Sequence, residues 1–87
     1  MPYIEKKKRE LLLSIIDEMA DKEIKADGDL NYILFYYAKY IVPHSYNSIK
    51  NFCAELRQTA TEIERRILAP YEDEKIKENG DVWVIHP

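Results

Sequence analysis

The chain has 87 residues, which is enough for one domain with one hydrophobic core. Hydrophobic residues make up 46% of it, and it contains only two glycines and four prolines, so the composition is that of a folded protein. The formal net charge of -3 argues against general affinity for nucleic acid. The single cysteine, Cys53, excludes an internal disulfide and makes the reducing cytoplasm the expected compartment.

The first predicted helix covers about residues 6–25. Apolar residues recur in it at helical spacing, namely Leu12, Ile15, Ile16, Met19 and Ile24. The apolar stretch from Leu11 is interrupted at Ser14 and soon followed by charges, so it is too short for a secretory signal or a membrane span. We expect Gly28 to end this helix at positive φ and Asp29 to cap the next one. The tight turn favours antiparallel packing of the two helices.

The second predicted helix, about residues 30–41, has two apolar stripes. One contains Leu30, Ile33, Leu34, Tyr37, Ala38 and Ile41, and the other contains Tyr32, Phe35, Tyr36, Lys39 and Tyr40. A helix that is apolar nearly all round is normally buried on every side, and so small a chain cannot surround it. The aromatic stripe is therefore predicted to face a partner or a ligand. The helix should stop before Pro43.

The third predicted helix begins after Ser45, which is suited to cap it. Its apolar stripe comprises Ile49, Phe52, Cys53, Leu56, Ala60, Ile63 and Ile67, and Glu62 and Arg66 are spaced for an ion pair. Pro70 should break or kink it and start a short helix that Gly80 closes. Residues 81–87 are β-prone. The fold class predicted is all-α: one domain over 1–87, a small antiparallel bundle of three helices with a kink at Pro70 and a short β-prone C-terminal tail.

Residues that could carry chemistry have simpler interpretations. Cys53 lies in an apolar stripe, where a thiol usually packs in the core, and His44 and His86 lie next to prolines in exposed segments. The acidic residues from Glu72 onward match no calcium loop and alternate with lysines, so a solvated helix face is expected. We therefore predict no catalytic residue, no metal site and no cofactor, and a protein that is not an enzyme.

The more informative pattern combines aromatic and basic side chains. The predicted ligand-binding residues are Tyr32, Tyr36 and Tyr40, one helical turn apart, and Arg57, Thr61, Arg65 and Arg66 on the polar side of the third helix. Tyrosine offers a stacking surface and arginine a fork of donors for phosphate or carboxylate. In the alternative interpretation the tyrosines form a subunit interface and the arginines pair with Glu62 and Glu64. Both roles can coexist at one subunit boundary.

Three segments carry a resemblance to known proteins. They are Met1-Pro2-Tyr3-Ile4, Leu30-Asn31-Tyr32, and the stretch from Arg65-Arg66 through Ala69-Pro70-Tyr71-Glu72-Asp73 to Glu78-Asn79-Gly80-Asp81-Val82. In these the chain resembles a family of short uncharacterised proteins found in phages and prokaryotic genomes. The resemblance implies a small phage-type helical protein in the cytoplasm of a host cell. By analogy, such proteins act by binding, either to a host protein or to nucleotide signals of bacterial immunity.

The function predicted from these observations is that of a homo-oligomeric binding protein that captures a small anionic, nucleotide-like ligand at a subunit boundary. A first alternative is an interaction module that masks a host or phage protein with its aromatic face. A second is a nucleic-acid-binding regulator, which the acidic charge balance disfavours. No membrane association is expected.

Overall fold

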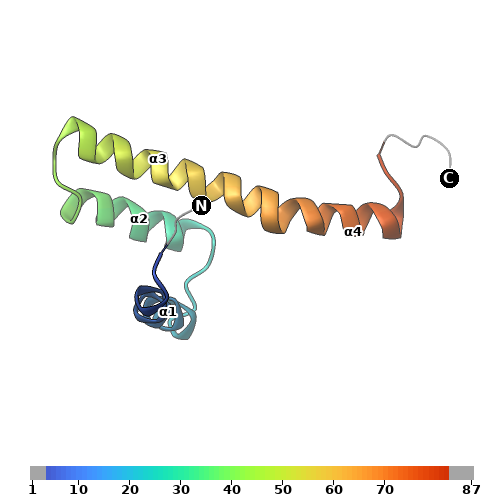
Figure 1. Cartoon of the computed structure of the whole chain (residues 1–87), viewed down its shortest axis with the longest axis horizontal. Coiled ribbons are helices and arrows are strands. Elements are labelled where there is room, and N and C mark those ends of the chain that lie inside the picture. The colour runs from blue at the N-terminus through green and yellow to red at the C-terminus, as the bar shows by residue number, and fades with distance from the viewer. Residues whose placement is uncertain (1–3, 83–87) are drawn as a thin grey trace. The chain divides into compact units, whose positions relative to one another are not determined.

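The computed structural model describes residues 4–82, and all regular structure within that range is helical (Figure 1). The elements in chain order are α1 (Lys6–Asp21), α2 (Gly28–Tyr40), α3 (Tyr46–Ile63), the π-helical turn η1 (Glu64–Leu68) and α4 (Ala69–Asn79). The all-α class is therefore confirmed. Of the β-prone tail, residues 83–87 lie outside the described range, so that part of the prediction stays a prediction.

The C-terminal end of α1 is closed by a Schellman motif. The N–H of Glu23 donates to the carbonyl of Ala20, and the N–H of Ile24 donates to the carbonyl of Met19, both at 3.0 Å. Glu23 takes the left-handed conformation, with φ at 55°. The motif ends the helix at Asp21, four residues before the end predicted from the apolar pattern.

One salt bridge supports the last turns of α1. The Nζ of Lys22 lies 2.7 Å from the Oε1 of Glu18, and both side chains are exposed. The hydrogen bond from Lys22, and secondly its positive charge, hold the pKa of Glu18 below its usual value.

The prediction that Gly28 ends the first helix at positive φ was wrong. Left-handed backbone occurs instead at Glu23, and Gly28 is the first residue of α2. The predicted cap was also misplaced by two residues, because Asp27 is the N-cap and its Oδ1 accepts from the N–H of Asp29 at 3.0 Å. The sequence contains two aspartates beside one glycine, and only the backbone path decides which carboxylate reaches a free N–H.

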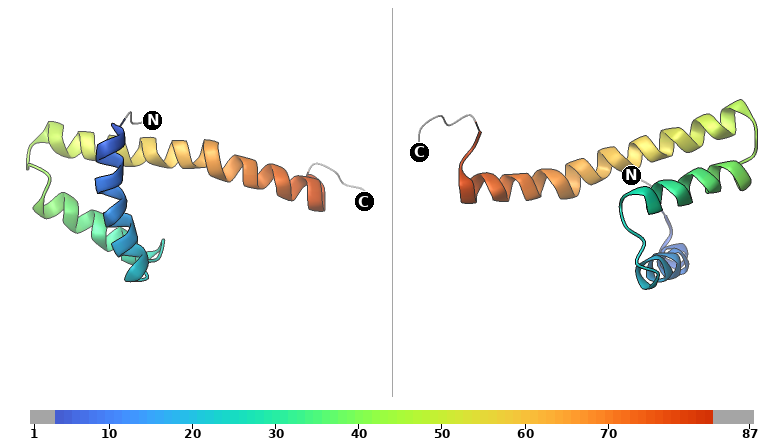
Figure 2. Two further views of the ribbon diagram at one scale, coloured as in Figure 1. Left: turned by 60° about the horizontal axis from the view of Figure 1, so that its bottom comes forward. Right: turned by 180° about the vertical axis from the view of Figure 1, so that it is seen from behind.

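The turn between α2 and α3 is held by side chains at both helix ends. The Nε2 of His44 lies 2.7 Å from the carbonyl oxygen of Lys39 in the last turn of α2. A carbonyl only accepts, so this ring nitrogen carries the hydrogen. Ser45 caps α3 as predicted, since its Oγ accepts from the N–H of Ser48 at 3.2 Å. The chain thus reverses, and α2 and the first turns of α3 run side by side (Figures 1 and 2).

The helical backbone continues through Pro70 by way of η1. The N–H of Ala69 donates to the carbonyl of Glu64, five residues earlier, instead of to the usual residue four earlier. Proline has no N–H, and in an α-helix its ring clashes with the carbonyl four positions before it. We attribute the π turn to this conflict. The helix then ends at Gly80, whose φ of 85° matches the predicted end.

The chain consists of two units that divide between Phe52 and Cys53, inside α3. No side chain in residues 4–82 is buried, and large hydrophobic side chains remain exposed on every α-helix. Neither unit by itself therefore forms, within the described range, the closed core that the composition predicts. The N-terminal unit holds α1, α2 and the start of α3, and the C-terminal unit holds the rest.

Candidate functional site

Three tyrosines form a continuous ladder along α2. The ring centroids of Tyr32 and Tyr36 are 4.5 Å apart, and those of Tyr36 and Tyr40 are 5.5 Å apart with the planes at 19°. Phe35 packs edge-on against Tyr36, at 5.4 Å between centroids. These tyrosines are brought together as their spacing predicts, because residues four apart on a helix are neighbours. We call Tyr32, Tyr36 and Tyr40 the tyrosine ladder.

The ladder is open to solvent on its outer side. Tyr32 is 63% exposed, Tyr40 is 69% exposed, and Phe35 beside them is 60% exposed, whereas Tyr36 between its neighbours is half-buried. Exposed phenol rings offer a surface on which a further flat group can stack.

Lys39 adds a positive charge to the ladder, and it was absent from the site predicted from sequence. Its Nζ lies 5.6 Å from the ring centroid of Tyr36 and 5.5 Å from that of Tyr40. Such distances are typical of cation–π contacts. The signal was present in the sequence, because Lys39 follows Tyr36 by three residues and directly precedes Tyr40.

The other stripe of α2 faces its own unit. The rings of Tyr37 on α2 and Phe52 on α3 stack with centroids 5.7 Å apart. Ile33, Leu34 and Ala38 of the same stripe are half-buried. Tyr37 and Ile41 of this stripe remain 49% and 63% exposed, so the unit covers only part of the stripe.

The basic residues of the predicted site lie in the C-terminal unit. Arg57 and Thr61 belong to α3, and the Thr61 hydroxyl donates to the Arg57 carbonyl at 3.1 Å. Arg65 and Arg66 lie inside η1, and both approach the carboxylate of Glu62, at 3.4 and 4.0 Å. The predicted pair of Glu62 and Arg66 is therefore confirmed.

Two features change how the arginines could be used. Glu62 has a side chain only 13% exposed and already lies between two guanidinium groups, so an anion at Arg65 or Arg66 must compete with a carboxylate. The π turn also begins at Glu64, so Arg65 does not continue the regular α-helical spacing that links Arg57 to Thr61. The ladder and the arginines are in different units.

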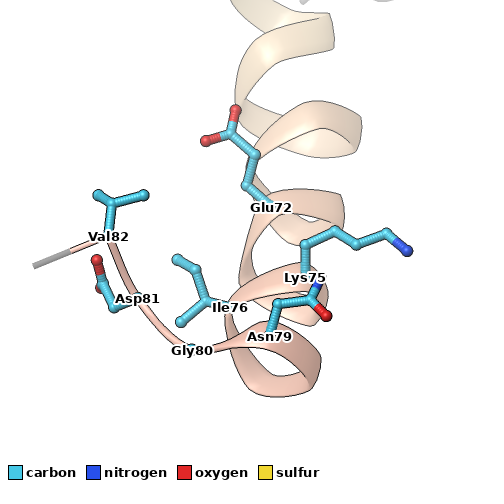
Figure 3. A pocket seen from close by; sticks show the side chains of 7 residues that line it. All are labelled: Glu72, Lys75, Ile76, Asn79, Gly80, Asp81 and Val82. Atoms are coloured by element: carbon cyan, nitrogen blue, oxygen red, sulfur yellow. The ribbon is translucent and has the colours of Figure 1, made fainter. Parts of the chain in front are cut away.

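A shallow hollow of about 330 Å³ lies at the C-terminal end of α4, where the chain turns at Gly80 (Figure 3). Ile76 faces the segment that turns back, and Glu72, Lys75 and Val82 are also in its wall. None of the predicted ligand-binding residues lines this hollow.

The remaining candidates can be placed as follows. Cys53 is half-buried on α3. The carboxylates of Glu74 and Glu78 pair with Lys77 and Lys75, at 3.4 and 3.2 Å, which agrees with a solvated helix face. Within residues 4–82 no group of three or more histidine, cysteine, aspartate or glutamate side chains is arranged to hold a metal ion. In the same range no helix has the length and apolar content needed to cross a bilayer.

Comparison with known proteins yields one result. Residues 1–82 match a family described as Domain of unknown function (DUF6899). No curated protein and no solved structure matches the chain. The expectation of an uncharacterised family is thus confirmed, while the phage origin stays a prediction. Because the match spans nearly the whole sequence, the chain belongs to the DUF6899 family.

Proposed function

We propose that this chain is a phage-type homo-oligomeric binding protein that captures a small anionic, nucleotide-like ligand of host immunity in the host cytoplasm. The observation that carries the proposal is the absence of any buried side chain in residues 4–82, together with an exposed tyrosine ladder. A folded chain with 46% hydrophobic residues is expected to bury many of them, and association supplies the missing burial.

The exposed area supports association through α2. Aromatic side chains bury about 150–250 Å² each when fully covered, and Tyr32, Phe35 and Tyr40 are 63%, 60% and 69% exposed, so together they offer roughly 400 Å². One subunit of a standard interface contributes about 800 Å². The ladder therefore covers about half of an interface, and other helical faces must contribute the rest. We expect the antiparallel three-helix bundle, the kink at Pro70 and the β-prone tail to take their final form in this assembly.

The ligand would use the ladder and Lys39 together. A nucleobase stacks on an exposed phenol face, and the ammonium group beside Tyr36 and Tyr40 attracts a phosphate. At the proposed subunit boundary Arg57, Thr61, Arg65 and Arg66 contribute further donors. A ligand anion at Arg57 displaces no carboxylate, since no ion pair of the Arg57 side chain is found within residues 4–82.

The association half of the proposal is tested by light scattering. Tyr36→Ala combined with Tyr40→Ala should shift the mass towards the monomer, because an aromatic anchor at an interface typically contributes about 2 kcal/mol or more. Tyr71→Ala, which removes an exposed tyrosine from α4, is the matched control. A wild-type chain that is monomeric at high concentration would refute the proposal.

The ligand half is tested by calorimetry with a panel of cyclic and linear nucleotides. Lys39→Gln, Arg57→Ala or Arg65→Ala should each weaken binding, since a charge-assisted hydrogen bond contributes about 1.5–3 kcal/mol. Lys75→Gln is the control, because Lys75 stands over Tyr71 at a similar 5.6 Å but outside the ladder. Binding that survives the first three substitutions unchanged contradicts the site.

A second candidate is a module that masks another protein, and the exposure of Phe35 beside the ladder favours it. Aromatic side chains are enriched in protein interfaces. If no nucleotide binds the wild type, this candidate takes precedence.

A further inference from the structure

The C-terminal unit carries an apolar stripe that no other helix in its described part covers. From Cys53 to Asn79 the chain is one continuous helix through α3, η1 and α4 (Figure 1). The stripe consists of Leu56, Ala60, Ile63 and Ile67. Leu56 is 37% exposed, Ile63 is 48% exposed and Ile67 is 65% exposed. We call these four residues the apolar seam.

The spacing of the apolar seam is that of a coiled coil. Its residues follow one another at alternating steps of four and three, the pattern by which one helix packs along another. A helix in water gains most of its stability from the packing of its apolar side. We therefore expect a further helix to lie against the seam.

Two unpaired charges border the apolar seam along one edge. Arg57 directly follows the seam residue Leu56. Glu64 directly follows the seam residue Ile63, so both charges lie about a quarter turn from the middle of the seam and on the same side. Neither has an opposite charge three or four residues away, and within residues 4–82 no ion pair is found for either side chain. A partner for each must come from outside this helix.

From the seam and its two bordering charges we propose that the apolar seam docks against the seam of a second copy of the chain, with the two helices antiparallel. Leu56 of one copy then lies level with Ile67 of the second, and Ala60 lies level with Ile63, each twice about the two-fold axis. The proposal rests on the self-association proposed above and identifies one of its interfaces.

The charges and the seam require the same register. In an antiparallel pair with a two-fold axis, equal edges of the two helices face each other. The register that aligns the seam residues leaves Arg57 of one copy and Glu64 of the second about 3 Å apart along the axis, an offset that a long arginine side chain can span. This ion pair also forms twice in the dimer.

A parallel pair fits the charges less well. In that arrangement the edge that bears Arg57 faces the opposite edge of the second helix. The residues that border the seam on that edge are Thr59 and Arg66, which offer no carboxylate to Arg57. The antiparallel second copy is therefore the occupant that pairs both charges.

The interface leaves Arg57 available to a ligand. A guanidinium group has five N–H donors, and a bidentate pair with a carboxylate uses two of them. The remaining donors can bind an anion without displacing Glu64 of the second copy. Arg57 is then at a subunit boundary, as the proposed function requires.

Cysteine cross-linking tests the register in the full chain. Two proteins are made in a Cys53→Ser background, one with Leu56→Cys and one with Ile67→Cys, and are mixed and oxidised. In the proposed register these two positions are level, whereas two copies of either position lie about 16 Å apart along the axis, too far for a disulfide. We expect the mixed dimer, identified by mass spectrometry, to exceed both like-with-like dimers by about five-fold or more. A predominance of the dimer linked through Leu56→Cys on both chains indicates a parallel pair and overturns the proposal.

The matched control for cross-linking is a mixture of Gln58→Cys and Arg65→Cys in the same background. These positions are also level in the proposed register, but they lie on the side of the helix away from the seam. The control pair should yield only background cross-linking. Equal yields from the control pair and the seam pair overturn the proposal.

Charge reversal gives a second readout, by sedimentation equilibrium without ligand. Arg57→Glu or Glu64→Arg alone should weaken self-association about ten-fold, because each places like charges together at two places in the dimer. The two changes in one chain should restore it, and Gln58→Glu, on the far side of the helix, should have no effect. Self-association that is unchanged in both single variants overturns the seam interface but leaves the proposed function standing, whereas a monomeric wild type refutes both.

Discussion

Replacing Glu23 with glycine is expected to stabilise the protein. Glu23 holds the left-handed position of the Schellman motif that ends α1, with φ at 55°. A side chain with a Cβ is disfavoured there, since the Cβ approaches the following carbonyl oxygen. Glycine has no Cβ and is the residue most often found at this position.

The size of the effect is a difference between two terms. The left-handed conformation costs an ordinary residue about 1–2 kcal/mol. Glycine in turn makes the unfolded chain more flexible, which offsets roughly 0.5–1 kcal/mol of the gain. The net stabilisation expected is therefore about 0.5–1 kcal/mol, or a rise in Tm of about 2–8 °C for a domain of this size.

Thermal unfolding followed by circular dichroism measures this shift, at one fixed protein concentration because association also stabilises. Glu23→Ala is the first control, since it removes the carboxylate from the C-terminal end of α1 but retains the Cβ. Lys22→Gly is the second, because Lys22 has an ordinary φ of -84°, so glycine there relieves no strain; it also removes the ion pair with Glu18, and Tm should fall. We expect Glu23→Gly alone to give the full increase.

The reasoning is refuted if Glu23→Gly lowers Tm, or if Glu23→Ala raises it by as much as Glu23→Gly does. The second result would show that the charge at the helix end, and not the backbone strain, set the stability.

Three further outcomes are expected. Lys22→Ala should raise the pKa of Glu18 towards its usual value in an NMR titration, and an unmoved titration curve would contradict the assigned cause. Because the pKa of Glu18 is lower in the folded state, its contribution to stability is present above the unfolded-state pKa. That contribution is lost as the pH falls through the folded-state pKa. His44→Ala should lower the free energy of unfolding in urea by about 0.5–1.5 kcal/mol, because it removes the hydrogen bond to the Lys39 carbonyl. His44→Gln keeps a hydrogen-bond donor and should lose less stability. Equal losses in the two variants would argue against the hydrogen bond. Pro70→Ala should restore regular α-helical hydrogen bonding through η1 and stabilise the helix by roughly 1–3 kcal/mol. Backbone chemical shifts report the bonding pattern and Tm reports the stability. A π-helical pattern that is retained in the variant would show that Pro70 is not its cause.

The local patterns of the sequence predicted most of the helices. Apolar residues at steps of three and four predicted α1, α2 and α3, and Ser45 and Gly80 marked a start and an end correctly. The tyrosine ladder also follows from spacing alone, because a rise of about 1.5 Å per residue brings side chains four apart into contact. These features depend on neighbours within one helical turn.

Only the folded chain decided which groups at a helix end bond to one another. Asp27 rather than Asp29 caps α2, and Glu23 rather than Gly28 takes positive φ, because the backbone path between helices selects the residue. The π turn before Pro70 arises from a carbonyl clash that apolar spacing does not report, and it moves Arg65 off the regular spacing that starts at Arg57. The contact between the rings of Tyr37 and Phe52 likewise depends on two helices meeting. Sequence periodicity determines which residues share a helix face, whereas the contacts between helices determine which face remains free for a partner.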